Sequence, residues 1–325
     1  MRDFFAGGVA FQRVAFKWKR FATLLLLFIA FVYFAVTGAM SFIYAGEAIR
    51  PAQEAVSPID RNLAYPYTSV TFRSRESNAH DNVLLSGWHF NASDTSNILI
   101  IVHGFGGNRF PFGAQTLDFI ESVIENGFNV LAFDLRNSGG AGSGASAFGL
   151  HEKYDVLGAV DYAKNAGYKN IVLFGVSTGA NAAAMAGAEA SMEEVGALIL
   201  DSPIVDTGNF IMYLIRSKNP KLPDFPFAFE TPMFAGLYLN GDIRDADAGV
   251  NLEGFMPRNV QLIYGNNDEI VSLAEITALY DGYMSRAVGK ISIWNVPGAG
   301  HGECFFTSRD EYFERVATFL KRVFA

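Results

Sequence analysis

The sequence predicts an α/β fold in which a mostly parallel sheet carries helices on both faces. Six short apolar runs rich in β-branched residues are typical of strands buried on both faces. Segments with apolar residues at helical spacing separate these runs, and this alternation is the order of a parallel sheet. A third observation, an uncharged run over residues 21–46, predicts one N-terminal transmembrane helix ahead of the sheet.

The N-terminal part of the chain divides into a basic segment, this apolar run and a linker. As a helix, residues 21–46 would extend for roughly 38 Å, which exceeds the ~30 Å of a hydrocarbon core. A cleaved signal peptide is the alternative, but its apolar region has about 7–15 residues and a small-residue cleavage site follows it. No clean site of that kind follows residue 46. We therefore expect a lasting anchor at 21–46 and a linker at 47–64.

Charge predicts the orientation of this helix. Residues 1–20 hold five of the chain's 25 lysines and arginines but only one of its 33 acidic residues. Basic residues collect on the cytoplasmic side of a membrane helix. We therefore expect a single-pass cell-membrane protein with residues 1–20 in the cytoplasm and the later residues outside. Those later residues carry 20 basic against 32 acidic residues, a formal charge of −12 that repels nucleic acid.

Residues 65–325 are expected to form one domain. The strands expected in its sheet are residues 97–103, 128–134, 170–176, 196–201, 259–265 and 290–296. Alternating residues in 67–74 and 82–90 predict an antiparallel hairpin at the sheet edge. Helical spacing of apolar residues predicts helices near 117–124 and 309–322. The long interval before strand 259–265 predicts a small cap at about 204–256, and four prolines there predict an irregular middle.

A serine lies between two glycines directly after one of the expected strands. Residues 174–180 read FGVSTGA, so that Gly175, Ser177 and Gly179 have the spacing of a sharp strand-to-helix turn. Such a turn exposes its serine at the carboxyl edge of a sheet, and glycine removes the side chains that would collide within it. Ser177 is therefore the candidate nucleophile.

A serine hydroxyl needs a base to take its proton and a carboxylate to orient that base. Of the five histidines, His301 alone lies beyond Ser177; the others are His80, His89, His103 and His151. Asp268 follows strand 259–265, which gives the chain order Ser, Asp, His. Asp201, at the end of strand 196–201, is the rival for the acid, and Glu269 is the less favoured neighbour.

Glycines after the first core strand predict an oxyanion hole. Residues 103–108 read HGFGGN, and glycine there lets backbone N–H groups approach a substrate oxygen. The expected donors are the amides of Phe105 and Thr178. His103 is expected to shape this turn rather than to carry a proton.

Together these motifs resemble the α/β-hydrolase superfamily. The segments HGFGGN, FDLRNSGGAGSG, GVSTGA, GNND and GAGHG occur in the order that this superfamily uses, across about residues 65–325. The chain is similar in particular to membrane-anchored bacterial members of the serine-aminopeptidase and prolyl-oligopeptidase-like type. The resemblance implies an α/β-hydrolase fold with Ser177 as nucleophile, Asp268 as acid and His301 as base. The chain departs from the pattern at Asn137, where such hydrolases usually carry glycine.

Two further patterns are interpreted as loops. Residues 140–145, GAGSGA, fit a dinucleotide-binding template, but they start several residues after their strand and open no convincing helix. Residues 242–249, DIRDADAG, hold three aspartates without the glycine and glutamate of a calcium-binding loop. The single cysteine, Cys304, excludes an intramolecular disulfide and a thiolate metal cluster. We therefore expect no cofactor and no metal.

The sequence thus predicts a membrane-anchored serine hydrolase that cleaves carboxylic esters. Its expected partners are a small ester or a short acyl or peptide substrate, and a lipid bilayer around the N-terminal helix. An aminopeptidase-like enzyme would need a carboxylate for the substrate amine, for which Asp224 and Glu230 are candidates. A thioester hydrolase and a non-catalytic surface binding protein are also open, because one triad serves several acyl groups and one fold hosts several functions. In the cap, 8 of 53 residues are aromatic, close to the 14% of the whole chain, so composition does not favour fatty-acyl substrates.

Overall fold

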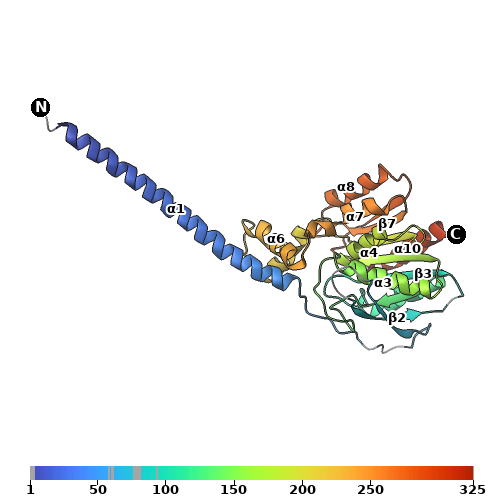
Figure 1. Cartoon of the computed structure of the whole chain (residues 1–325). Coiled ribbons are helices and arrows are strands. Elements are labelled where there is room, and N and C mark those ends of the chain that lie inside the picture. The colour runs from blue at the N-terminus through green and yellow to red at the C-terminus, as the bar shows by residue number, and fades with distance from the viewer. Residues whose placement is uncertain (1–3, 58, 60–61, 76–81, 93, 325) are drawn as a thin grey trace.

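The computed structural model describes residues 4–57, 59, 62–75, 82–92 and 94–324, without the side chains of residues 4–17. A long N-terminal helix leads into an α/β domain, and the C-terminus lies on the far side of that domain (Figure 1). His80, one of the five histidines, lies outside the described residues.

An eight-stranded sheet forms the centre of the domain, in the order β1-β2-β4-β3-β5-β6-β7-β8. The strands are β1 (Thr68–Arg73), β2 (Leu84–Phe90), β3 (Asn97–Val102), β4 (Asn129–Phe133), β5 (Asn170–Val176), β6 (Ala197–Asp201), β7 (Asn259–Gly265) and β8 (Ile291–Val296). Strand β2 is antiparallel to β1 and to β4, and the remaining pairs, along the order β4-β3-β5-β6-β7-β8, are parallel. This arrangement confirms the mostly parallel sheet with a hairpin at its edge.

Helices cover both faces of the sheet. On one face, the core is built from α3 (Glu152–Asn165), α4 (Thr178–Glu189), α7 (Ala248–Phe255) and α8 (Leu273–Met284). On the other face, α2 (Thr116–Glu125) and α10 (Arg309–Phe324) pack on the sheet. The short helices η1 (Gly113–Gln115) and α9 (Cys304–Thr307) connect longer elements. The sheet is therefore buried on both sides, which explains its continuous apolar runs.

Helix α1 (Phe4–Ala48) is long and apolar enough over Trp18–Ala48 to cross a membrane. It is continuous, so the basic N-terminal segment and the expected span belong to one helix. From residue 21 to residue 36 every side chain is exposed, whereas Thr37, Ser41, Ala45 and Ala48 are at most 7% exposed. The free part of α1 therefore ends where the helix meets the domain.

The segment between β6 and β7 folds into a group of helices. These are α5 (Thr207–Lys218), α6 (Phe227–Leu239), η2 (Ile243–Ala246) and α7. Of these helices, α5 and α6 lie against α1, and α7 packs on α4. Three of the four prolines, Pro220, Pro223 and Pro226, lie in the irregular segment between α5 and α6, whereas α6 continues through Pro232. Proline removes one helical hydrogen bond. Aromatic packing of Phe234 and Tyr238 on Phe42 of α1 supports the helix, and such tertiary packing overrides local propensity.

The predicted linker is held against the loops at the carboxyl edge of the sheet. The Ser146 N–H donates to the Ile49 carbonyl at 3.0 Å. The amide of Gln53 donates to the Asn137 side chain at 2.9 Å, and Asn108 donates to the Ala55 carbonyl at 3.2 Å. The N-terminal helix is therefore joined to the domain by a segment that is hydrogen-bonded to these loops.

Candidate active site

Ser177 occupies a sharp turn between β5 and α4. Its backbone has φ 55° and ψ −127°, a conformation that L-residues rarely adopt. A Cβ atom at Gly175 would lie 2.5 Å from the Ala180 Cα atom, and one at Gly179 would lie 2.2 Å from the His103 carbonyl oxygen. Both distances are too short for nonbonded carbon or oxygen atoms. The two glycines therefore permit the close approach that the turn requires.

The structure brings Ser177, His301 and Asp268 together in one hydrogen-bonded series. The Ser177 Oγ lies 2.8 Å from His301 Nε2, and His301 Nδ1 lies 2.8 Å from Asp268 Oδ2. With the hydroxyl donating to Nε2, Nδ1 carries the ring proton and donates to the carboxylate. This is the arrangement in which a histidine can take a proton from serine.

Asp268 is fixed by the loop after β7. Its Oδ1 accepts hydrogen bonds from the N–H groups of Ile270 at 2.8 Å and Val271 at 2.9 Å, which leaves Oδ2 for His301. The Asp268 side chain is 1% exposed and that of His301 is 15% exposed. Glu269, the less favoured alternative, is exposed to solvent. A carboxylate with both oxygens engaged can hold the imidazole in one orientation.

The two expected oxyanion donors lie in backbone segments next to Ser177. A Cβ atom at Gly104 would be 3.7 Å from the Ser177 Oγ, so the loop that carries Phe105 passes beside the hydroxyl. Thr178 is the first residue of α4. Helix N-termini present N–H groups that lack intrahelical acceptors and carry partial positive charge.

His103 is bonded to two backbone groups beneath this loop. Its Nε2 accepts from the Leu135 N–H at 3.0 Å, so Nδ1 carries the proton and donates to the Gly104 carbonyl at 2.8 Å. Burial lowers the pKa of the His103 imidazole below its usual value, which keeps the ring neutral. The ring ties the loop before Phe105 to the end of β4.

Asp201, the rival acid, is engaged away from His301. Its Oδ2 accepts from the Tyr312 hydroxyl at 2.8 Å and its Oδ1 accepts from the Ser202 hydroxyl at 2.9 Å. Burial raises the pKa of the Asp201 carboxyl. The series continues to the histidine loop, because the Gly302 N–H donates to the Ser202 Oγ at 3.1 Å. The geometry thus assigns Asp201 to loop support rather than to direct contact with the imidazole.

Ser202 was not among the residues predicted from the sequence. Its hydroxyl links the end of β6 to the residue after His301. Ser202 has φ 52°, a left-handed conformation that is uncommon for serine. The available signal was a polar residue directly after the buried strand end at Asp201, but the partner 100 positions away is not visible in the sequence.

The remaining residues singled out in the sequence have structural partners. Asn137 has φ 56°, a left-handed conformation. Glycine adopts this conformation most readily and asparagine is among the next best, which explains asparagine at a position where glycine is usual. Cys304 is fully buried, and burial raises the pKa of its thiol. Asp242 is ion-paired with Arg244, and Asp247 accepts from the Thr207 N–H and hydroxyl.

A cavity of about 390 Å³ adjoins the oxyanion loop. Phe105, Gly106 and Gly107 form one wall, and the end of α1 with the C-terminal part of α5 forms another. A larger hollow of about 880 Å³ lies on the cap, between α5, α6 and η2, and Ser177, His301 and Asp268 do not line it. The same three residues do not line the smaller cavity either, but it is the better candidate for a substrate path, because it touches the loop beside Ser177.

Comparison with known proteins gives a family match across most of the domain. The model of the alpha/beta hydrolase family matches residues 99–316. A curated relative, the uncharacterised protein YqkD of Bacillus subtilis (strain 168), is 25% identical over 240 residues, which are 73% of this chain and 75% of that protein.

Solved structures of esterases share the fold. A structure of the Pyrococcus furiosus esterase Pf2001 superposes with a TM-score of 0.64 and 26% identity, covering 85% of this chain and all of the esterase. A second crystal form of the same esterase gives a TM-score of 0.69 with 24% identity, over 85% of this chain and 98% of that one. Est1E from Butyrivibrio proteoclasticus, solved with ferulic acid bound, has a TM-score of 0.56 and 19% identity, over 75% of this chain and 96% of its own.

Proposed function

The chain belongs to the alpha/beta hydrolase family, and from that membership we propose that it is a membrane-anchored serine hydrolase that cleaves carboxylic esters. The observation that supports this best is the series Ser177–His301–Asp268, with two contacts of 2.8 Å at the carboxyl ends of β5 and β7. The similarity to solved esterases supports an ester as substrate.

In the proposed reaction His301 Nε2 takes the Ser177 proton while the Oγ attacks the carbonyl carbon of the ester. The oxyanion accepts hydrogen bonds from the amides of Phe105 and Thr178. His301 then gives the proton to the departing alcohol, and an acyl group stays on Ser177. Water, deprotonated by His301, attacks this acyl-enzyme and releases the acid. Asp268 keeps the proton on Nδ1 and stabilises the imidazolium that forms in each step.

An aminopeptidase-like activity has less support. Glu230, one candidate for the substrate amine, is 7% exposed and accepts hydrogen bonds from Thr37 and Ser41 of α1. Asp224, the other candidate, is ion-paired with Arg216 on the surface. Both carboxylates are thus engaged with other parts of the protein, which favours ester over aminoacyl substrates. Side-by-side turnover of short nitrophenyl esters and aminoacyl anilides tests this preference.

A serine-directed probe tests the proposed nucleophile. The full-length protein in detergent should react with a fluorophosphonate at one site, and Ser177→Ala should abolish this labelling. Ester turnover should fall by at least about a thousandfold in the same variant. Ser191→Ala, which alters an exposed serine after α4, should leave both readouts unchanged. Labelling that persists in Ser177→Ala would refute the assignment.

The proposal places residues 1–20 in the cytoplasm and the catalytic domain outside the membrane. The basic residues before the apolar run support this orientation. Protease added to intact cells should then degrade the domain. Protection of the domain in intact cells, with degradation after lysis, would place it on the cytoplasmic side instead.

A further inference from the structure

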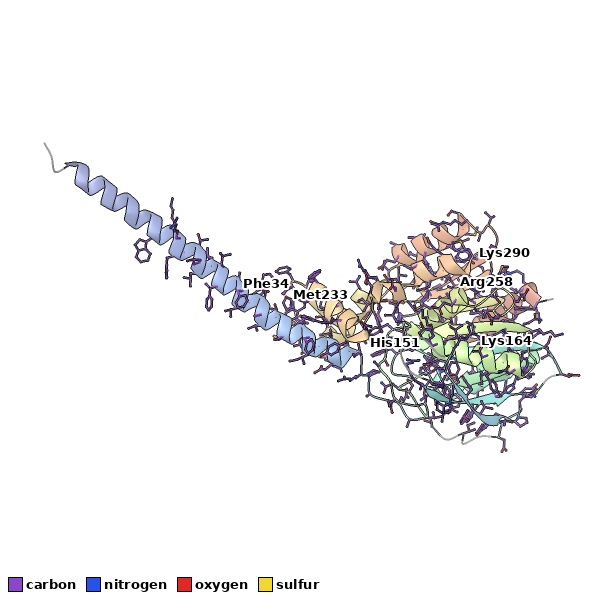
Figure 2. The ribbon with its side chains drawn as sticks, viewed as in Figure 1. Phe34, His151, Lys164, Met233, Arg258 and Lys290 are labelled. Carbon is purple, nitrogen blue, oxygen red and sulfur yellow. The ribbon has the colours of Figure 1, made fainter. Side chains whose placement is uncertain are left out.

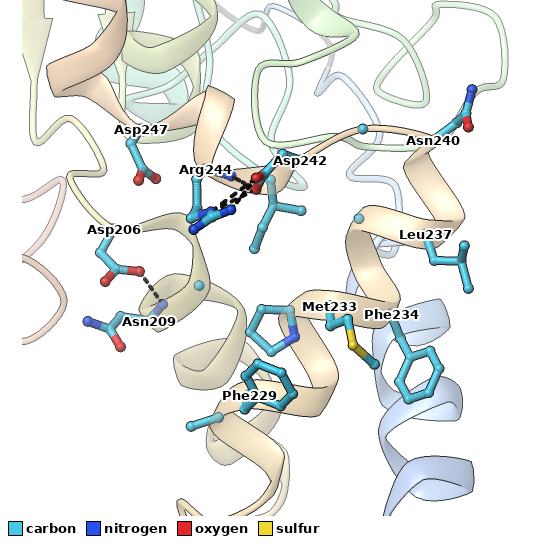
Figure 3. Close-up of a pocket in the computed structure, with 16 residues that line it drawn as sticks. Asp206, Asn209, Phe229, Met233, Phe234, Leu237, Asn240, Asp242, Arg244 and Asp247 are labelled. Carbon is cyan, nitrogen blue, oxygen red and sulfur yellow. Dashed lines mark hydrogen bonds and ion pairs between the residues drawn. The ribbon is translucent and has the colours of Figure 1, made fainter.

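Cap helix α6 exposes a ridge of large apolar side chains. Phe225, directly before the helix, is 68% exposed, and Phe229, Met233 and Leu237 are 72%, 50% and 69% exposed. Residues four positions apart lie on one face of a helix. Figure 3 shows Phe229, Met233 and Leu237 along α6, beside the large hollow on the cap. An apolar face of this size in a monomeric protein commonly marks an interaction site. We call these four residues the α6 ridge.

Beside the ridge, α6 packs on α1 and runs parallel to it, and Phe225 of the ridge takes part in this contact. Near its start, Phe225 contacts Phe34 with ring centroids 5.9 Å apart, and near its end Tyr238 stacks on Phe42 at 4.7 Å. The two helices therefore run side by side in the same direction, and Figure 2 shows Phe34 and Met233 on these neighbouring helices.

A buried carboxylate joins the same two helices between these aromatic contacts. Glu230 accepts from the hydroxyls of Thr37 at 3.2 Å and Ser41 at 3.1 Å. It is the one charged residue of α6, and it points away from the ridge toward α1. The exposed face of α6 is thus free of charge.

The exposed part of α1 is too short to cross a bilayer by itself, which places the exposed face of α6 at the membrane surface. The basic residues before the apolar run end at Arg20, and every residue from 21 to 36 is exposed, although Phe34 already contacts Phe225. These 16 positions extend for roughly 24 Å, whereas a hydrocarbon core is about 30 Å thick. A helix that spans the bilayer must therefore include part of the segment docked against α6, and tilt would increase that part.

We propose that the α6 ridge lies in the outer leaflet of the bilayer that α1 crosses, so that the cap and the anchor form one membrane-contacting surface. The inference rests on the proposed membrane span of α1. The occupant of the ridge is lipid because the ridge continues the exposed apolar surface of α1.

Charged groups next to the ridge limit how deep it lies. Lys218 and Lys221, before α6, are exposed, and Asp224 is ion-paired with Arg216. Lysine and arginine can bury their apolar stems while their charged ends reach the headgroups. The ridge is therefore expected about 5–10 Å inside the boundary between headgroups and acyl chains, as for amphipathic interfacial helices.

The same placement at the membrane also bears on which substrates reach the site. A groove lined by Tyr33, Met40 and Tyr44 of α1 and by the loop before α6 shares Tyr44, Lys218 and Asn219 with the cavity at the oxyanion loop. Both openings lie beside the part of α1 that the proposal puts at the membrane surface. The proposed esterase site is therefore expected to take esters that partition into the bilayer.

Quenching by lipid measures the position of the ridge directly. In the full-length variant Phe229→Cys, the introduced thiol is labelled with an NBD fluorophore. The labelled protein is reconstituted into vesicles of phosphatidylcholine and phosphatidylglycerol, and its emission is compared between vesicles with and without brominated acyl chains. Cys304 is fully buried and its thiol pKa is raised, so the introduced thiol is the one labelled. Bromination should clearly reduce the emission at position 229, because a label about 5–10 Å inside the headgroup boundary lies among the acyl chains. A label at Val288→Cys, an 80% exposed site near β8, should not respond.

A third label separates this inference from the proposed anchor. Leu26→Cys lies in the free part of α1 and should be quenched if α1 spans the bilayer. Quenching at 26 and 229 supports the inference, whereas quenching at 26 alone overturns it and leaves the anchor intact. Absence of quenching at both positions overturns the anchor and the ridge together. A label at 229 that is shielded from aqueous iodide yet insensitive to brominated lipid would indicate a protein partner, and would also overturn the inference.

Discussion

At the scale of single residues, the turn that holds Ser177 requires glycine at position 179, because there is no room for a Cβ atom there. A Cβ atom at Gly179 would lie 2.2 Å from the His103 carbonyl oxygen, so Gly179→Ala must displace the turn or the oxyanion loop. We expect a loss of about 1–3 kcal/mol in the free energy of unfolding, as for other overpacked positions, and a fall in ester turnover of at least about tenfold. Urea unfolding and nitrophenyl-ester kinetics measure the two effects.

A second helical glycine provides the matched control. Gly282 in α8 is exposed, and a Cβ atom there would meet no heavy atom within 4 Å. Gly282→Ala should therefore stabilise the protein by about 0.5–1 kcal/mol, because alanine loses less backbone entropy in a helix. Equal effects of the two substitutions would contradict the steric explanation.

The buried histidines predict acid lability. Burial lowers the pKa of His103 and of His89 in the folded protein, while both titrate near 6.5 when unfolded. Above that pH neither state binds the proton, and stability is unaffected. Below it the unfolded chain gains protons that the folded chain does not, so the free energy of unfolding falls by up to about 1.4 kcal/mol per pH unit for each group.

His103→Gln isolates one of these groups. Glutamine can keep hydrogen bonds to the backbone without titrating. Between pH 6.5 and 5 the free energy of unfolding of the variant should fall less steeply with decreasing pH. The difference in slope corresponds to the uptake of up to about one proton. The charged groups that face His103, Asp134 and Arg109, are present in both the parent and the variant. Asp201, whose pKa is raised by burial, is also present in both. Their contributions therefore cancel when the two slopes are compared. Urea unfolding of the full chain at several pH values gives the slopes, and identical slopes would show that His103 does not contribute.

At the scale of elements, the contact between α1 and α6 depends on one buried carboxylate. Glu230→Ala leaves the Ser41 hydroxyl, which is fully buried, without its acceptor. Such a group costs about 1–3 kcal/mol. Hydrogen exchange of the α6 amides in the full-length protein should accelerate accordingly.

Two other substitutions check that this effect belongs to the buried hydrogen bonds. Glu230→Gln keeps an acceptor oxygen for Ser41 and should change exchange in α6 less than Glu230→Ala. Glu253→Ala removes one member of an exposed ion pair with Arg286 and should change stability by no more than about 0.5 kcal/mol. Unchanged protection of α6 in Glu230→Ala would contradict the role given to this carboxylate.

For the whole molecule, α1 is part of the folded domain as well as a candidate membrane span. Thr37, Ser41 and Ala45 are buried, and Thr37 and Ser41 donate to Glu230 of α6, so a fragment that begins at residue 47 would uncover the inner face of α6. In one detergent, this fragment should unfold several degrees below the full chain, because several kcal/mol of packing are lost. A fragment that begins at residue 33 keeps these contacts and should unfold close to the full chain. Equal thermal midpoints for all three proteins would show that α1 does not stabilise the cap.

Local patterns in the sequence determined the sheet, the order of its strands along the chain and the apolar helix. Strand and helix periodicities and the glycines around Ser177 depend on neighbouring residues, so they can be recognised along the chain. The sequence also predicted a serine, an acid and a histidine in that order. Their roles stay a prediction, which the proximity of the three side chains supports.

Tertiary structure decided the features that depend on distant residues. It placed Asp268 rather than Asp201 beside His301, it linked Ser202 to Gly302, and it joined Ser41 to Glu230 across 189 positions. The cap shows the difference most clearly. Composition gave no aromatic enrichment there, yet α6 continues through Pro232 where it packs on α1, and it leaves large apolar residues on one exposed face. Composition counts side chains, whereas folding decides which of them are covered, because burial is set by contacts between segments far apart in the chain.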